Sequence, residues 1–262
     1  MTDRNIRLTI EYDGTAYSGW QEQPQSPTIQ GTLEQRLNQL CGHPIQLLVA
    51  GRTDAGVHAL GQTANFHTRT TLPVRHIQKV MNQLLPHDIR VVKAAQVHPN
   101  FHATIHAKAK LYRYIIRNCH DYTVFDRNTY HHFRQPLNVK AMRQAAKVLV
   151  GTHDFSAFRG NLGHRANPVR TLNKISIKKK GHDVVLDYTG VSFLHQMIRI
   201  LTGTLLYAGL GKFTPEDIKN ILRSKDRKKA GPTLPPTGLF LVKVYYPRVF
   251  PPVKNKKPEA LE

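Results

Sequence analysis

The order in which strand-like and helix-like hydrophobic patterns follow one another constrains the fold of this chain most strongly. Apolar residues that recur every second position line one face of a strand, whereas a period near 3.6 marks one face of a helix. In the first part of the chain these patterns predict six elements, which are a strand over 5–12, a helix over 28–41, strands over 45–50 and 61–67, a helix over 73–85 and a strand over 89–97. This β-α-β-β-α-β order is that of the split, ferredoxin-like unit.

The rest of the chain repeats the same plan without repeating the sequence. The patterns predict a strand over 106–117, a helix over 138–149 capped by Asn138, strands over 172–179 and 182–189, helices over 192–209 and from Thr214, and a strand over 239–246. We therefore predict an α+β protein in which two ferredoxin-like (RNA-recognition-like) β-α-β-β-α-β units, residues 1–105 and 106–250, join their sheets into one large mixed, mainly antiparallel sheet with a central cleft. Residues 251–262 are rich in Pro and Lys and are expected to form a disordered tail.

Charge indicates the kind of partner. The chain carries 38 Lys and Arg against 17 Asp and Glu, a net charge of +21. Such an excess favours a polyanion, and nucleic acid is the first choice, with an anionic membrane surface or a ribosomal environment as the alternatives. Two cysteines without a CxxC pair argue against a disulfide scaffold or a zinc site and fit a reducing cytoplasm. No run of residues is apolar enough to span a membrane and no targeting segment opens the chain, so we expect a cytoplasmic protein without a membrane partner.

Residues 51–59, Gly-Arg-Thr-Asp-Ala-Gly-Val-His-Ala, are the most informative segment, and they lie between two predicted strands. Asp54 is one of few acids in a basic chain, and Arg52 lies two residues before it. An ordinary turn explains the segment equally well, because Asp hydrogen-bonds nearby backbone and Gly adopts positive φ. His58 lies close enough to orient this loop, although a structural role is the commoner one for such a histidine.

The longer string closely resembles the active-site motif of the tRNA pseudouridine synthase A family. Other family-like segments follow the same order over about residues 5–246, namely Tyr12-Asp13-Gly14, Gly19-Trp20-Gln21, Phe101-His102-Ala103, Lys110-Leu111-Tyr112-Arg113-Tyr114, His153 to Phe158, Phe193-Leu194, Met197-Ile198-Arg199, Ala230 to Thr233 and Gly238-Leu239. The resemblance implies an enzyme that isomerises uridine to pseudouridine at positions 38, 39 and 40 of the tRNA anticodon stem-loop. It also implies a homodimer.

The resemblance places individual roles on this chain. Asp54 falls on the family's catalytic aspartate, Tyr112 on the tyrosine that packs against the target base, and Arg199 on the basic residue that pairs with the aspartate. Arg52 falls on an arginine linked with extruding the base. Further RNA-binding residues are expected in the family-like segments and in the basic clusters, and these are His58, Phe101, His102, Lys110, Arg165, Arg170 and Leu239.

The chemistry explains why these residue types are needed. A carboxylate can act as a covalent nucleophile, and a neighbouring arginine favours its charged form in a dry pocket. Within the predicted helix over 192–209, His195, Arg199 and Gly203 are spaced to share one face. The isomerisation oxidises nothing and imports no group, so we expect no cofactor. We also expect no metal, because His98, His102 and His106 would bind one only from a single helix face, and Pro99 argues against a helix there.

Other interpretations stay open. Taken alone, Tyr112 fits an ordinary sheet-face tyrosine, and Arg199 fits a solvated or phosphate-binding residue. A catalytically silent RNA-binding protein built from the same two sheets is the first alternative function. A sibling pseudouridine synthase that acts on other RNA positions is the second, because the fold alone does not fix the substrate.

Overall fold

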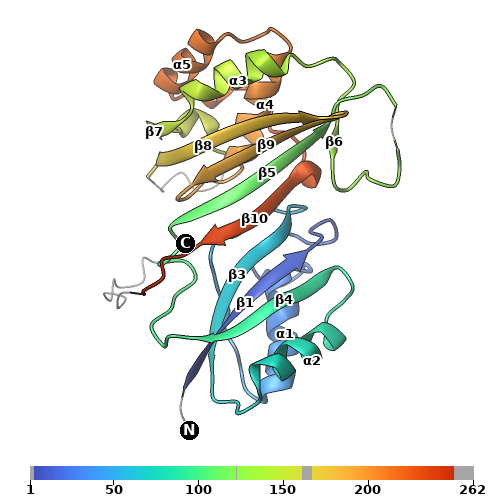
Figure 1. The fold of residues 1–262 in the computed structure, drawn as a ribbon, viewed down its shortest axis with the longest axis vertical. Helices are drawn as coiled ribbons and strands as arrows, with labels where there is room; N and C mark the ends of the chain where they lie inside the picture. Colours follow the sequence, from blue (N-terminus) through green and yellow to red (C-terminus); the bar gives the residue numbers. More distant parts are fainter. Residues whose placement is uncertain (1–2, 122, 161–166, 251–262) are drawn as a thin grey trace.

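The computed structural model describes residues 3–121, 123–160 and 167–250. Within these ranges the strands form one ten-stranded sheet in the order β4-β1-β3-β10-β5-β9-β8-β7, with β2 added to β3 and β6 added to β5 (Figure 1). Most neighbouring strands are antiparallel. The α+β fold with one large mixed sheet is thus confirmed.

The first half of the sheet has the ferredoxin-like strand order β4-β1-β3-β2. Its elements are β1 (Arg4–Tyr12), α1 (Ile29–Cys41), β2 (Leu48–Val49), β3 (His58–Thr68), α2 (Val74–Leu84) and β4 (Ile89–Val97). Thr28 accepts a hydrogen bond from the backbone N–H of Gly31 and caps α1, and Gly42 ends the helix in a left-handed conformation at φ 71°. Both ends of this helix were therefore predictable from the sequence.

The predicted strand over 45–50 is wrong in length, because only Leu48–Val49 pair with β3. The backbone N–H groups of Ile45 and Leu47 instead donate to the side chains of Asn38 and Glu34 on α1. Their apolar side chains are buried as the pattern implied, but their hydrogen bonds go to a helix. Burial and strand pairing are separate properties, and the sequence pattern reports the first.

The second half has the same strand order, β10-β5-β9-β8, with β7 added at the edge. Its elements are β5 (Ala109–Arg117), β6 (His131–His132), α3 (Val139–Val148), β7 (Gly151–Asp154), the 3₁₀ turn η1 (Ser156–Phe158), β8 (Val169–Lys180), β9 (Asp183–Gly190), α4 (Met197–Gly209), α5 (Pro215–Ser224), the 3₁₀ turns η2 (Arg227–Lys229) and η3 (Pro236–Gly238), and β10 (Leu239–Tyr245). Asn138 caps α3 as predicted. The helix expected over 192–209 begins only at Met197, because Gln196 has φ 57° and breaks the helical path.

A short parallel contact joins the two halves of the sheet. His58 pairs with Phe240 and Ala59 with Leu241, which connects β3 to β10. Helices α1 and α2 lie on one half and α3, α4 and α5 on the other, so β10 occupies the middle of the molecule (Figure 1). The predicted junction of two sheets is therefore made by β10, the last strand among the described residues.

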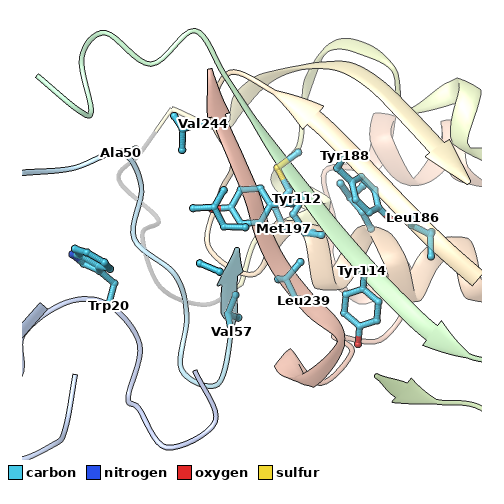
Figure 2. Packing of buried hydrophobic residues seen from close by; sticks show 14 of the residues in the cluster. Trp20, Ala50, Val57, Tyr112, Tyr114, Leu186, Tyr188, Met197, Leu239 and Val244 are labelled. Atoms are coloured by element: carbon cyan, nitrogen blue, oxygen red, sulfur yellow. The ribbon is translucent and has the colours of Figure 1, made fainter. Parts of the chain in front are cut away.

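The hydrophobic core is continuous across this junction. Figure 2 shows Val57 of the first half near Leu239, Met197 and Tyr112 of the second half, all of them buried. Farther into the second half, the rings of Tyr114 and Tyr188 are fully buried. Because apolar packing is short-ranged, this shared core fixes the two halves relative to each other. No helix in the described residues is long and apolar enough to cross a membrane.

Candidate active site

A cleft of about 810 Å³ lies where the two halves meet. Its walls come from residues 46–54 of the first half and from β5, residues 192–198 and Leu239 of the second. Six of the residues that the sequence singled out line it, and they are Arg52, Asp54, His102, Lys110, Tyr112 and Leu239. Residues far apart in the sequence therefore share one concave surface of the size expected for a ligand site.

The loop that carries Asp54 is held from several sides. The Thr53 carbonyl accepts a hydrogen bond from the backbone N–H of Trp20, and the Thr53 hydroxyl bonds the Tyr12 hydroxyl at 2.8 Å. The Asp54 carbonyl accepts from the N–H of Val57 at 3.1 Å, and Gly56 adopts φ 74° within this turn. The turn expected for Asp-Ala-Gly is thus present, and it leaves the Asp54 carboxylate directed at other partners.

Two cationic or potentially cationic groups face the two oxygens of that carboxylate. Nη1 of Arg199 lies 3.7 Å from Oδ2 of Asp54, and Nε2 of His195 lies 3.7 Å from Oδ1. Arg199 is held in place because its Nε donates to the Leu234 carbonyl at 2.6 Å. The Arg199 side chain is only 14% exposed, so its charge acts on Asp54 through little water. The guanidinium of Arg199 thus places a positive charge beside the Asp54 carboxylate.

Tyr112 lies beside the carboxylate as a buried ring. It contacts Phe193 edge-on, with ring centroids 5.1 Å apart. Burial raises the pKa of the Tyr112 hydroxyl far above its ordinary value, and the charges of Tyr12 and Asp54 raise it further. The hydroxyl therefore stays protonated near neutral pH. Tyr114, two residues on, is a core residue whose hydroxyl donates to the Pro235 carbonyl.

Lys110 provides a buried cation in the wall of the cleft. Its Nζ lies over Gly51, where a Cβ would come within 2.9 Å of it. Burial lowers the pKa of Lys110 to about 8, and the charge of Arg170 contributes in the same direction. The Nε of Arg170 has no hydrogen-bond partner among the described residues. The side chains of Lys110 and Arg170 together suit an anionic ligand such as a phosphate. Arg165, also predicted to bind RNA, lies outside the described residues.

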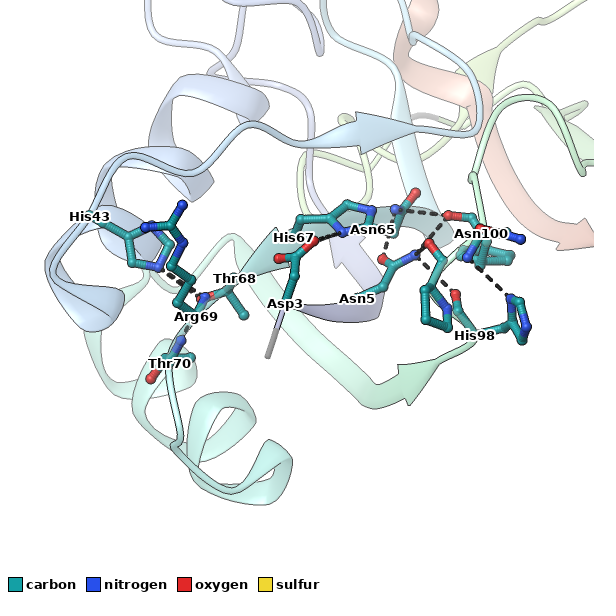
Figure 3. A network of polar contacts seen from close by, with 12 residues as sticks. Asp3, Asn5, His43, Asn65, His67, Thr68, Arg69, Thr70, His98 and Asn100 are labelled. Atoms are coloured by element: carbon teal, nitrogen blue, oxygen red, sulfur yellow. Dashed lines mark hydrogen bonds and ion pairs between the residues drawn. The ribbon is translucent and has the colours of Figure 1, made fainter. Parts of the chain in front are cut away.

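A buried pair of amides, Asn5 and Asn65, holds the backbone on either side of His102, which lines the cleft; Figure 3 shows the two amides. Asn65 of β3 donates to Oδ1 of Asn5 of β1 at 2.9 Å and accepts from the N–H of Ala103 at 2.8 Å. Asn5 in turn donates to the carbonyls of His98, Pro99 and Phe101. The segment that connects the two halves is thereby bonded to the first sheet at several points.

Two predicted RNA-binding residues lie among packed core residues instead of in the lining of the cleft. The ring of His58 stacks on Phe240 at 4.8 Å, and its Nδ1 accepts from the N–H of Gly14 while facing Asp13. Burial lowers the pKa of His58, which favours its neutral form. The ring of Phe101 is buried between other aromatic rings, with Tyr246 at 5.1 Å. Direct contact of these two side chains with RNA stays a prediction.

The sequence interpretation missed the position of His195. It placed this residue on a helix face beside Arg199, but His195 precedes α4, and the turn at Gln196 brings its ring to Asp54. Its place directly after Phe193-Leu194 was the signal available in the sequence. In the described residues, no group of three or more His, Cys, Asp or Glu side chains could hold a metal ion.

Comparisons with known proteins agree with this geometry. Residues 8–104 and 145–247 match the family model described as tRNA pseudouridine synthase. The chain is 43% identical over 243 residues to tRNA pseudouridine synthase A of Thermoanaerobacter sp. (strain X514). This alignment covers 93% of this chain and 100% of the relative. The chain is 42% identical over 243 residues to the protein of that name from Acetivibrio thermocellus and 44% identical over 243 residues to that from Geotalea uraniireducens, each again covering 93% of this chain and 100% of the relative. The chain therefore belongs to the tRNA pseudouridine synthase family.

Proposed function

We propose that this protein isomerises uridine to pseudouridine at positions 38, 39 and 40 in the anticodon stem-loop of tRNA. The observation that carries the proposal is the Asp54 carboxylate, which lines a cleft formed by both halves of the protein and pairs with Arg199. Family membership and the relatives named tRNA pseudouridine synthase A support the reaction and the tRNA substrate. The positions in the stem-loop rest on the sequence resemblance.

The reaction breaks the bond between ribose C1′ and N1 of uracil, turns the base, and joins it again through C5. In the proposed mechanism the Asp54 carboxylate acts as the nucleophile, and the guanidinium of Arg199 lies beside it. The uracil must first leave the stem, at a cost of a few kcal/mol. Arg52, an exposed residue of the cleft lining, fills the position in the stem that the extruded base leaves. The ring of Tyr112 packs against the extruded base. None of these steps needs a cofactor.

The remaining parts of the proposal concern the whole molecule. We propose that residues 1–105 and 106–250 are its two structural units and that it works in the cytoplasm as a homodimer, with one tRNA spanning both subunits. Sedimentation velocity is expected to give a dimer of the 29.8 kDa chain. A monomer alone at micromolar concentration contradicts the dimer.

The decisive experiment replaces the nucleophile without changing its size. Asp54→Asn retains the shape of the side chain and removes its negative charge, so pseudouridine formation should be lost while tRNA binding persists within a few-fold. Site-resolved mapping of pseudouridine in unmodified tRNA, treated with wild type or variant, measures both the activity and the positions.

Each other outcome of this mapping selects another interpretation. Wild type that forms no pseudouridine favours the silent RNA-binding protein. Pseudouridine at positions outside 38–40 favours the sibling enzyme. An Asp54→Asn variant that keeps full activity removes Asp54 as the nucleophile. Glu11→Gln is a matched control, because Glu11 is an exposed carboxylate of β1 outside the cleft lining.

A further inference from the structure

Besides the attack by Asp54, the isomerisation needs two proton movements. When C5 of the turned uracil bonds to C1′, C5 carries both its hydrogen and the new bond, and C6=N1 is a double bond. The C5 proton must then leave, and N1 must gain one. No net proton is consumed, so one side chain that accepts and then donates a proton is sufficient.

The cleft contains few side chains suited to that task. Arginines such as Arg52 and Arg199 stay protonated at physiological pH. Burial and neighbouring charges keep the Tyr112 hydroxyl protonated. Asp54 is the nucleophile of the proposed reaction. Lys110 and His102 also line the cleft, but among the described ion pairs only Arg199 and His195 contact the Asp54 carboxylate.

We propose that His195 accepts the C5 proton of the rejoined base at Nε2 and returns a proton to N1. This rests on the proposed function and adds a catalytic residue to it. The C5–H bond breaks, its electron pair forms the C5=C6 double bond, and the C6=N1 π electrons move to N1. N1 then takes the proton from the imidazolium, which becomes neutral again.

The position of Nε2 supports this role. It lies 3.7 Å from Oδ1 of Asp54, and His195 lines the cleft with 27% of its side chain exposed. A group so close to the nucleophile also lies close to the nucleotide on which the nucleophile acts. When the imidazole gains the proton, the adjacent carboxylate stabilises the new positive charge. Imidazole is also the side-chain type that ordinarily exchanges protons near neutral pH.

The backbone holds His195 next to Gly160. The N–H of Gly160 donates to the His195 carbonyl at 2.9 Å. A Cβ at Gly160 would lie 2.6 Å from Nδ1 of His195 and 2.7 Å from Oε1 of Gln196, so only glycine permits this approach. Gln196 adopts a left-handed φ of 57°, a backbone conformation that residues other than glycine rarely adopt. A sparsely populated backbone conformation of this kind is a device for holding a functional side chain.

The test follows the C5 proton directly. His195→Gln and wild type are compared in single-turnover reactions with tRNA that carries hydrogen or deuterium at C5 of its uridines. The variant is expected to react about 10² to 10⁴-fold more slowly. Its deuterium isotope effect should exceed that of wild type, because removal of the C5 proton becomes the slow step. His153→Gln is the matched control, since His153 lies in β7 outside the cleft lining.

A second substrate separates proton transfer from the earlier steps. In tRNA containing 5-fluorouridine, C5 has no proton to lose, so consumption of 5-fluorouridine reports only the steps before that point. We expect His195→Gln to consume it within about twofold of the wild-type rate. Equal losses on both substrates, with an unchanged isotope effect, would show that His195 acts earlier or only supports the fold, and would overturn the proposal.

Two further variants guard against a folding artefact. Imidazole added to His195→Ala should restore a measurable part of the rate, because the cleft is open to small molecules. Gly160→Ala should displace the ring and raise the isotope effect while leaving His195 in the sequence. Failure of both, with tRNA binding intact, contradicts the proposal. Wild type that makes no pseudouridine would refute the proposed function itself, which is a distinguishable result.

Discussion

Lys110 illustrates how the fold sets the charge of a single residue. Burial and the nearby Arg170 lower its pKa to about 8, so the ammonium is fully present below that pH and is lost above it. The prediction that Lys110 binds an RNA phosphate implies weaker binding as the pH rises, because only the protonated form attracts the phosphate. The charge that the cleft presents to RNA is thus sensitive to mildly alkaline pH.

We expect the affinity of wild type for tRNA to fall by up to about tenfold between about pH 7 and about pH 9 at constant ionic strength, since one pKa unit corresponds to tenfold. Lys110→Arg keeps its charge throughout this range and should show a flatter dependence. Fluorescence anisotropy titrations at several pH values measure both. Parallel curves for the two proteins would mean that Lys110 does not contact the RNA.

At the same scale, the sequence indicated Asp54, Tyr112 and Arg199 through family-like segments; in the structure Asp54 and Tyr112 line one cleft, and Arg199 pairs with Asp54. It did not indicate the contact of His195, because that contact depends on the left-handed turn at Gln196. Gln is not a residue type that signals positive φ. Because Gln196 adopts this rare conformation, the contact between His195 and Asp54 could not be predicted from the sequence.

Among the elements, β1 and β3 carry an unusual buried pair, Asn5 and Asn65, whose amides hold the segment that leads to β5. Both side chains are almost completely inaccessible, and buried polar groups must be hydrogen-bonded to be tolerated. This pair anchors the connection between the two halves and places His102 at the cleft.

Asn65→Leu should therefore lower the free energy of unfolding by about 1–3 kcal/mol, because it leaves the Ala103 N–H and the Asn5 amide without their partner. Urea denaturation followed by circular dichroism measures the loss. Asn100→Ala, an exposed change in the same segment, serves as the control and should alter stability by less than about 0.5 kcal/mol. Equal stabilities for the two variants would rule out an anchoring role.

Most long elements were predictable because amphipathic periodicity and caps are local. Strand 89–97 and helix α1 agree with the prediction closely. The short strands β6 and β7 were not predicted, since two to four residues carry too little periodicity to read. The early start expected for α4 was wrong because Phe193 and Leu194 continue the apolar pattern, whereas the left-handed φ of Gln196 delays the helix until Met197.

For the whole molecule, the excess of positive charge predicts how binding responds to salt. With a net charge of +21, phosphate contacts should supply much of the affinity for tRNA. Raising monovalent salt from about 50 to about 200 mM should weaken binding by about 10² or more. Measured at constant pH, an affinity that does not change over this range would contradict a phosphate-lined binding surface.

The two-part construction determines how the site is assembled. Asp54 belongs to the first half of the sheet, whereas Tyr112, His195 and Arg199 belong to the second. Neither half contains a complete set, so the stability of the junction between β3 and β10 is a condition for activity.

That junction also bears on the timing of biosynthesis. β10 is the final strand of the sheet, and it lies between β3 and β5 (Figure 1). During synthesis the segment with Asp54, the proposed nucleophile, emerges long before β10, whose Leu239 lines the cleft. Nascent chains are therefore expected to stay catalytically inert until residues 239–245 have emerged and docked between β3 and β5.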